Sequence, residues 1–242
     1  MRSGRRAAAA LALTWIVTAQ LACGSPLQSG EILVLPGATE RLIIAMRMGY
    51  AGAGEAVAPA RLERAVLDEQ LPTGAAAAGR LGDWVLENDR VIAVVTRIDG
   101  TRRGGRLVDL TRGDAEHDAL ERFELSVAGR EVRYDAASTG RDETTGAVYV
   151  ELSGAVEGLP GVLVSTRYDV APALPAVLVH TQVRGLGAEH REAPGWIADR
   201  VEFRGAGRLE LAAAPEGAGS SELAPGHAAW IAERLSYLLR PL

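Results

Sequence analysis

The residues best suited to chemistry in this chain are a histidine, an arginine and an aspartate in two consecutive apolar-rich segments. His180 lies within the alternating segment 176–184, and Arg167 and Asp169 lie within the alternating segment 162–170. Alternation predicts that all three side chains share the sheet face opposite the valines. A histidine, a cation and a carboxylate on one face suit general acid–base catalysis or the binding of sugar hydroxyls. Cross-strand charge pairing explains the same three residues equally well.

A second group combines the residue types that hold metal ions. Oxygen ligands at alternating positions can take Ca²⁺, and a histidine among them suits a transition metal. The members are Asp114, Glu116, His117 and Asp118. The run lacks the glycine and the distal bidentate glutamate of a known calcium loop, so a solvated loop is the simpler interpretation. The sequence also has no HExxH motif, no paired cysteines and no phosphate-cradling glycine loop before a helix, and we expect no cofactor.

Three tryptophans are candidates for stacking on a sugar ring, provided that they are exposed: Trp84, Trp196 and Trp230. The chain has only two phenylalanines, and large aromatic residues more often anchor a core. The sequence leaves both interpretations open.

Composition limits the classes of partner. The 242 residues are 48% apolar and carry a net charge of −5, and every basic side chain is an arginine. The arginines are scattered among acidic residues and form no basic face of the kind that neutralises phosphates. We therefore expect a globular protein that does not bind nucleic acid.

The first 22 residues have the parts of an export signal. Three arginines precede an apolar run at 7–19, and small residues follow it up to Cys23, the only cysteine. Such a run covers about 20 Å as a helix, less than the ~30 Å of a bilayer core. Residues 21–25 resemble a bacterial lipoprotein processing box, which implies cleavage before Cys23 and lipidation of its thiol. We expect an exported protein held by a lipid anchor in the cell envelope, at the outer membrane.

Short apolar segments with turn residues between them predict a chain of β-strands. Asn88 and Asp89 tolerate the positive φ of a tight two-residue hairpin turn, and Ala128-Gly129 predicts another turn. Residues 24–30 form a short polar leash with Ser, Pro and Gly, and residues 31–35 and 41–48 form either a first hairpin at the edge of the domain or an ordered extension of this leash. Further strands are expected at 84–87, 90–96, 107–110, 122–127, 148–152 with Gly154 closing it, 162–170, 176–184, 197–203, 208–211 and 228–233.

No long amphipathic helix is expected after residue 80, so the fold class is an all-β antiparallel sandwich. The domain organisation expected is a signal peptide at 1–22, a lipidated cysteine with a leash and an irregular β segment at 23–79, and the sandwich at 80–242. Apolar residues at 235–242 with no polar tail are expected to leave an unpaired edge. The chain is therefore expected to be incomplete as a functional unit, being either shortened or in need of a partner.

Two pieces of the sequence resemble known proteins. Residues 82–91, Gly-Asp-Trp-Val-Leu-Glu-Asn-Asp-Arg-Val, together with Gly-Gly-Arg-Leu-Val-Asp-Leu at 104–110, resemble the opening of a group of large, mostly uncharacterised lipoproteins of myxobacteria and their relatives. Residues 164–172 and 179–184 are similar to paired strands of β-supersandwich domains, as in galactose mutarotases. The resemblance implies a supersandwich fold, while the catalytic His and Glu of mutarotases have no matching position here.

These observations favour one function over another. The favoured function is a non-catalytic module of the cell envelope that binds carbohydrate or a protein partner, because the segments that resemble known families contain none of their catalytic residues. The alternative is an enzyme acting on sugars through His180, Arg167 and Asp169.

Overall fold

The computed structural model describes residues 59–74, 76–111, 118, 120–172, 174–185 and 198–204 with their side chains. It describes the backbone alone for residues 27–33, 40–46, 197, 208–211, 228–231 and 236–241. The signal peptide expected at 1–22 and Cys23 lie outside the described residues. No helix in the described part of the chain is long and apolar enough to cross a membrane.

The described residues form an all-β fold with one short 3₁₀ helix, η1 (Asp68–Gln70), and no α-helix. The strands of the first half are β1 (Leu27–Leu33), β2 (Glu40–Met46), β3 (Arg61–Arg64), β4 (Trp84–Glu87), β5 (Ile92–Val95), β6 (Leu107–Thr111) and β7 (Leu120–Val127). The strands of the second half are β8 (Arg130–Arg141), β9 (Val148–Val156), β10 (Leu163–Val170), β11 (Ala176–Arg184), β12 (Ile197–Arg204), β13 (Arg208–Leu211), β14 (Ala228–Ile231) and β15 (Ser236–Pro241). The prediction of an all-β chain without long helices is confirmed for these residues.

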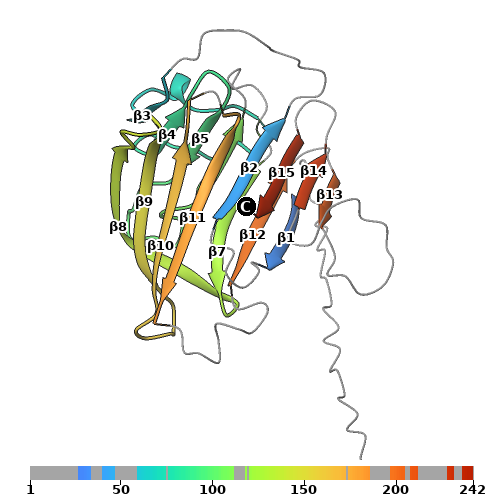
Figure 1. Ribbon diagram of the computed structural model, residues 1–242. Helices are drawn as coiled ribbons and strands as arrows, with labels where there is room; N and C mark the ends of the chain where they lie inside the picture. The colour runs from blue at the N-terminus through green and yellow to red at the C-terminus, as the bar shows by residue number, and fades with distance from the viewer. Residues whose placement is uncertain are drawn as a thin grey trace, which may run out of the picture.

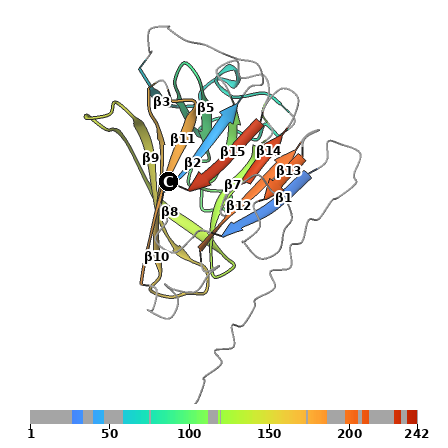
Figure 2. The same ribbon diagram turned by 45° about the vertical axis from the view of Figure 1, so that its right-hand side comes forward.

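All the strands join one large antiparallel sheet, which does not close on itself. Its longest path runs β13-β14-β15-β2-β11-β10-β9-β8-β7-β6-β5-β4-β3, and β12 pairs with both β7 and β1. Figures 1 and 2 show β8 to β11, β2 and β15 as one broad, twisted surface, with β7, β12 and β1 on the other side of the molecule. The β7–β8 hairpin joins these two groups of strands through only two residue pairs.

The core lies between the two groups of strands. Valines and other apolar residues of β9, β10 and β11 form a single buried cluster with residues of β4 to β7 and β12. Val164, Thr166, Tyr168 and Val170 are buried while Ser165 and Arg167 are half-exposed, as the alternation predicts. The facing residues Val177, Val179 and Thr181 are buried in the same way. Within this core, the hydroxyl of Tyr134 lies 2.6 Å from the hydroxyl oxygen of Thr166.

Both hairpins predicted from residue type form, but only one has the predicted turn geometry. Ala128 and Gly129 take φ angles of 53° and 68°, as a two-residue turn between twisted strands requires. β4 pairs with β5 as predicted, but neither Asn88 nor Asp89 has a positive φ, so the predicted two-residue turn is wrong. The Asn88 side chain shapes its turn instead: Oδ1 accepts the N–H groups of Arg90 and Val91 at 2.7 and 2.8 Å.

Three further predictions about the strands are wrong. β1 and β2 do not form a hairpin, because β1 pairs with β12 and β2 pairs with β11 and β15. Gly154 does not close β9, which continues to Val156. Residues 236–241 leave no unpaired edge, since β15 pairs with β14 on one side and β2 on the other. For β1, β2 and β15, pairing with a strand distant in sequence decides the outcome, and local pattern carries no information about it.

Replacing Asn88 with alanine is expected to destabilise the fold by about 2–3 kcal/mol. Besides its two acceptor bonds, the nearly buried Asn88 amide donates to the carbonyls of Ala171 and Leu174 at 2.6 and 2.9 Å. It therefore ties the β4–β5 turn to the β10–β11 loop. Urea denaturation measures the loss. Asp89→Ala, in the same turn, should stay within about 0.5 kcal/mol of the wild type. Equal losses of stability from the two changes would contradict a stabilising role for the hydrogen bonds between Asn88 and the β10–β11 loop.

Candidate functional site

Arg167, Asp169 and His180 come together on the outer face of β10 and β11, as predicted. Arg167 lies directly opposite His180 across the two strands. Its Nε lies 2.9 and 3.0 Å from the two carboxylate oxygens of Asp169, and its Nη2 lies 2.6 Å from Oδ1. The Nε2 atom of His180 is 3.6 Å from Asp169 Oδ2. The guanidinium also covers the ring of Tyr149 on β9, 3.8 Å from its centroid.

This arrangement neutralises the aspartate. The Asp169 side chain is only 6% exposed and is held in a fork by Arg167, whose side chain is 30% exposed. Burial lowers the pKa of Arg167, but the hydrogen bonds and charge of Asp169 outweigh burial, so its pKa lies above the ordinary value. Both carboxylate oxygens of Asp169 are thus engaged by the guanidinium. The Arg167–Asp169 pair lies within β10, and the contact of Asp169 with His180 crosses to β11. The geometry therefore fits charge pairing on the sheet face better than acid–base catalysis.

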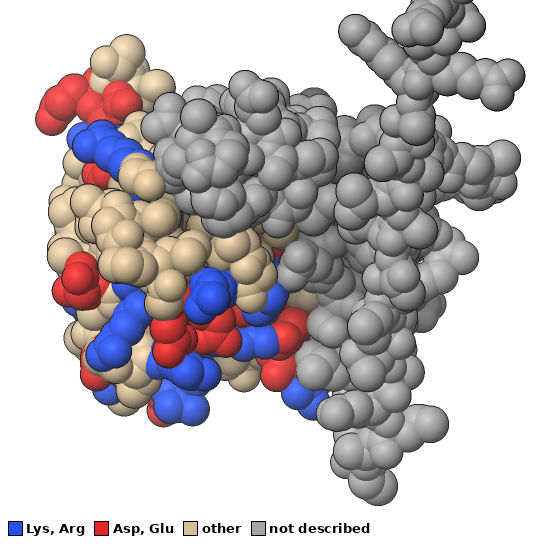
Figure 3. Space-filling model, turned by 90° about the horizontal axis from the view of Figure 1, so that it is seen from below, with Lys and Arg blue, Asp and Glu red and all other residues tan. Residues whose placement is uncertain are grey.

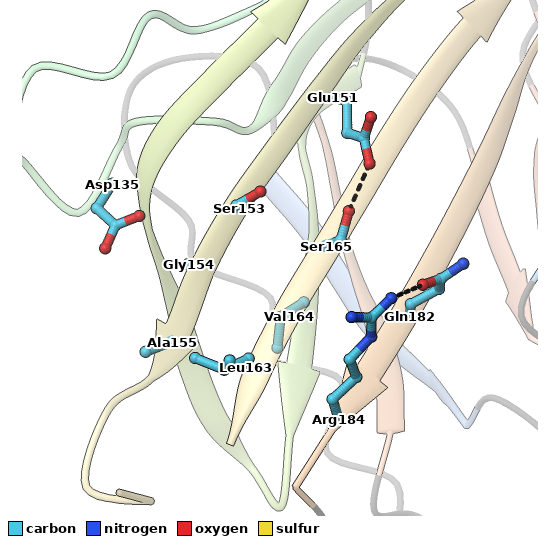
Figure 4. A pocket seen from close by; sticks show the side chains of 10 residues that line it. All are labelled: Asp135, Glu151, Ser153, Gly154, Ala155, Leu163, Val164, Ser165, Gln182 and Arg184. Carbon is cyan, nitrogen blue, oxygen red and sulfur yellow. Dashed lines mark hydrogen bonds between the residues drawn. The ribbon is translucent and has the colours of Figure 1, made fainter. Parts of the chain in front are cut away.

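Beside this cluster, the same sheet face is hollowed into an open pocket of about 360 Å³. A β-bulge in β8 forms one wall. Tyr134 pairs with Gly154 and Ala136 pairs with Ser153, so Asp135 is an extra residue without a partner across the ladder. A bulge of this kind re-aims the side chain of the additional residue. Asp135 accordingly lines the pocket (Figure 4).

Gly154 allows the bulge to form. A Cβ atom at this position would lie 2.1 Å from the carbonyl oxygen of Arg133 and 2.6 Å from Tyr134 Cα. Both contacts are with backbone, which cannot rotate away as a flexible side chain can. Glycine at position 154 thus lets β8 approach β9 closely enough to turn Asp135 into the pocket.

The lining of the pocket combines polar and apolar groups from four neighbouring strands. Ser165 donates to Glu151 at 3.0 Å, and Arg184 donates to the side-chain oxygen of Gln182 at 3.2 Å. Figure 4 shows Asp135 on the β8 side and Arg184 on the β11 side, with the two serines between them. The full lining is Asp135, Glu151, Ser153, Gly154, Ala155, Leu163, Val164, Ser165, Gln182 and Arg184.

Comparison with protein-family models, with curated proteins and with solved structures finds no match to this chain. The interpretation of the site therefore rests on its own geometry.

Of the three tryptophan candidates, only Trp84 is described with its side chain, and it does not line the pocket. Trp84 is 5% exposed and belongs to the hydrophobic core, and the guanidinium of Arg64 lies 3.8 Å above its ring. It has the position of a core anchor, and a ring so enclosed has no free side for a sugar. Trp196 lies outside the described residues. Trp230 is described only by its backbone, which pairs with Leu209 in β13 and Tyr237 in β15.

Of the four metal-ligand candidates, only Asp118 is described, and Asp114, Glu116 and His117 lie outside the described residues. Asp118 is buried, and its Oδ1 accepts the N–H groups of Leu110 and Leu120, each at 3.1 Å. Its backbone N–H donates to Thr73. Among the described residues, no three His, Cys, Asp or Glu side chains lie where they could hold one metal ion. Asp118 therefore fixes local backbone in the described part of the fold.

Asp109 forms a buried carboxyl pair with Asp118. A bulge between β5 and β6 places Asp109 against residues 78 and 79, whose N–H groups donate to its carboxylate at 2.7 and 2.8 Å. Burial raises the pKa of Asp109 from 3.8 to about 6, although these two bonds and the side-chain hydrogen bond with Asp118 lower it. The folded chain therefore holds a proton at Asp109 more tightly than the unfolded chain does.

Stability is accordingly expected to fall as the pH rises through the Asp109 transition. The contribution of the protonated form is complete below the unfolded pKa of 3.8 and is lost as the pH passes about 6. Relative to Asp109→Asn, which cannot ionise, the wild type should lose about 2–3 kcal/mol between about pH 4 and pH 8. Denaturant melts across this range measure the difference. Asp68→Asn on η1 is the exposed control, and parallel curves for the wild type and Asp109→Asn would contradict the shift.

A network of arginine–glutamate pairs occupies the outer face of β6, β7 and β12. Arg106 Nε lies 2.6 Å from Glu124 Oε2, and the two side chains are only 10% and 8% exposed. Arg122 bridges Glu124 and Glu202. Burial raises the pKa of Glu124 above its ordinary value even though Arg106 and Arg122 lower it.

The described surface seen from below carries arginines and acidic residues intermixed rather than gathered by sign (Figure 3). On this face, the described arginines therefore form no patch separate from the acidic residues.

Sequence reasoning found the His180 cluster but missed the pocket beside it, whose polar lining includes Asp135, Glu151, Ser153, Gln182 and Arg184. One feature of the sequence could have indicated the bulge that forms a wall of this pocket. Gly154 interrupts an otherwise regular strand pattern, and a glycine inside a strand often marks a bulge or the close approach of another backbone. The partner of that bulge depends on the pairing of β8 with β9, which the sequence does not reveal.

Proposed function

We propose that the protein is a non-catalytic module of the cell envelope that binds carbohydrate in the pocket on the outer face of β8 to β11. The observation that carries the proposal is the lining of that pocket, where carboxylate, hydroxyl, amide and guanidinium groups converge on one open space. Such groups match the alternating donors and acceptors of a polyhydroxylated ligand. An open pocket suits part of a longer saccharide better than a small enclosed molecule.

The groups of the pocket have spare hydrogen-bonding capacity. Ser153 and Asp135 are exposed and have no hydrogen-bond partner within the described part of the chain. Gln182 accepts one bond from Arg184, which leaves its NH₂ group to donate. These groups are positioned on strands rather than on loops, so a ligand would meet a site that is already formed.

Binding without turnover is favoured by the state of Asp169. Its carboxylate is enclosed and paired with Arg167, so it supplies neither a free base nor a free nucleophile. The second candidate, a sugar-cleaving enzyme using His180, Arg167 and Asp169, draws on the distance of 3.6 Å between His180 and Asp169. That contact can orient a histidine for proton transfer.

A glycan array combined with a reducing-sugar release assay tests the two candidates. The wild type is expected to bind a subset of glycans and to release no reducing sugar. Gln182→Ala, which removes a pocket donor, should weaken binding by roughly 5-fold or more. Asp68→Asn, on η1 outside the pocket lining, should bind as the wild type does. Turnover that disappears in His180→Ala would overturn the non-catalytic proposal, and the absence of any glycan binding would refute the carbohydrate site.

The proposed location is the bacterial envelope, with a lipid anchor on Cys23 and the outer membrane as its site. The order of charged, apolar and small residues before a lone cysteine supports it. A labelled fatty acid fed to an expressing bacterium should mark the protein, and Cys23→Ser should abolish both the label and fractionation with membranes. A Cys23→Ser form that keeps both would end this proposal.

We also propose that the sheet is a β-sandwich of the supersandwich type, as in the myxobacterial lipoprotein group that the sequence resembles. The support is the single core shared by β9 to β11 and by β4 to β7. A crystal structure should show two packed sheets about 10 Å apart. Any other arrangement of the two groups of strands would contradict the sandwich.

A further inference from the structure

The pocket has a negatively charged side chain on one side and a positively charged side chain on the other, and neither forms an ion pair within the described part of the chain. Asp135, on β8, has no hydrogen bond or ion pair within the described part of the chain. Arg184, on β11, has a hydrogen bond to Gln182 but no acidic partner among the described residues. Figure 4 shows the two side chains on opposite sides of the pocket.

Other charges of the described surface form ion pairs: Arg204 lies 2.7 Å from Glu121, and Arg102 lies 3.4 Å from Glu157. Glu151, the other acid of the pocket, accepts a bond from Ser165 and lies directly across from Arg167 in the sheet. Asp135 and Arg184 are therefore the charges of the pocket that a ligand can satisfy without breaking an existing pair.

The strand order fixes the span between these charges. β8 and β11 are separated by β9 and β10, which is three strand spacings, or about 14 Å. A single sugar ring does not bridge that distance. The neutral floor between the two walls carries the hydroxyls of Ser153 and Ser165, which suit sugar hydroxyls.

We infer that the pocket takes an oligosaccharide bearing an amino group and an acidic group on different residues. The ammonium of an amino sugar lies at Asp135, and the carboxylate of an acidic sugar lies at Arg184. The inference rests on the proposed carbohydrate site and adds the charge and polarity of its ligand. Each contact is a charge-assisted hydrogen bond at the rim of an open pocket, so each contributes modestly and weakens in salt.

Calorimetric titration of the full chain with four tetrasaccharides measures the contributions of the amine and of the carboxylate to binding separately. N-unsubstituted heparosan carries amines and carboxylates, N-acetylated heparosan carries carboxylates alone, chitosan oligomer carries amines alone, and chitin oligomer carries neither. N-unsubstituted heparosan is expected to bind tightest. Removal of either kind of charge should weaken binding by about 5-fold at low ionic strength, and the preference should fade as salt is added.

Two pocket variants test which side of the pocket binds the amine of the ligand and which side binds its carboxylate. Asp135→Asn should remove the preference for probes that carry an amine, and Arg184→Gln should remove the preference for probes that carry a carboxylate. Arg102→Gln, which removes an arginine outside the pocket, should change neither preference. Equal binding of all four probes by the wild type would overturn this inference and leave the carbohydrate site intact. A preference for one kind of charge alone would also overturn it, whereas no binding of any probe would refute the carbohydrate site itself.

Discussion

Gly154→Ala is expected to destabilise the protein by about 4 kcal/mol and to abolish ligand binding in the pocket. The new methyl group would overlap the backbone of residues 133 and 134, where the nearest atom is 2.1 Å away. β8 would have to move away from β9. That movement displaces Tyr134 from its buried bond to Thr166 and carries Asp135 out of the pocket. Thermal denaturation and the glycan-binding assay measure the two effects.

Gly161→Ala is the matched control for this substitution. Gly161 has a φ of 83°, but a Cβ atom there would meet nothing within 4 Å. Its cost should therefore be only that of a left-handed alanine, about 1 kcal/mol. Binding should be retained, because Gly161 does not line the pocket. Similar stability losses for the two substitutions would show that the close approach of β8 to β9 is not what requires glycine at position 154.

Glu124→Gln is expected to cost about 3–4 kcal/mol of unfolding free energy. The change leaves the Arg106 guanidinium, 10% exposed, without its partner at 2.6 Å. The remaining acid near Arg106, Glu131, lies farther away at 3.5 Å and is itself 32% exposed. An enclosed charge that loses its counter-ion keeps the cost of leaving water and loses the compensating attraction. Chemical denaturation at neutral pH measures the loss.

Two further variants separate loss of a pair from loss of a charge. Glu157→Gln breaks the exposed pair with Arg102, whose side chains are 60% and 73% exposed, and should cost less than about 0.5 kcal/mol. Arg106→Met combined with Glu124→Leu removes both enclosed charges together and should recover most of the stability lost in Glu124→Gln. If the double variant is no more stable than Glu124→Gln, packing rather than charge explains the loss.

Alternation in the sequence predicted the strands whose partners are their immediate neighbours. In β10, residues 164, 166, 168 and 170 are buried in the core, and Arg167 and Asp169 lie on the opposite face, where they pair with each other. Local hydrophobic pattern contains that alternation. The clustering of Arg167, Asp169 and His180 followed from the same pattern together with a short connection between β10 and β11. Sequence reasoning thus placed one part of the polar face correctly.

The rest depended on pairings that no local pattern encodes. The bulge at Asp135 arises where β8 pairs with β9. The second half of β8, residues 135–141, contains small and polar residues of low strand propensity. Asp109 reaches the N–H groups of residues 78 and 79 only because residues 73–79 return to Asp118 and β6. Local sequence pattern also does not predict the pairing of β2 with β11 and β15. Each of these contacts gains its energy from tertiary packing, which overrides local propensity.

The position of β2 has a consequence for the time course of folding. β2 ends at Met46 and pairs with β15, which begins at Ser236, so one of the central ladders of the sheet joins the two ends of the described chain. A ladder of such high contact order closes slowly, because a long loop must lose its entropy before any hydrogen bond forms. Until β15 arrives, one edge of β2 stays open in the middle of the sheet and can pair with another chain. A nascent chain therefore remains vulnerable to aggregation until β15 has emerged, and its yield should depend on chaperone capacity more than on final stability.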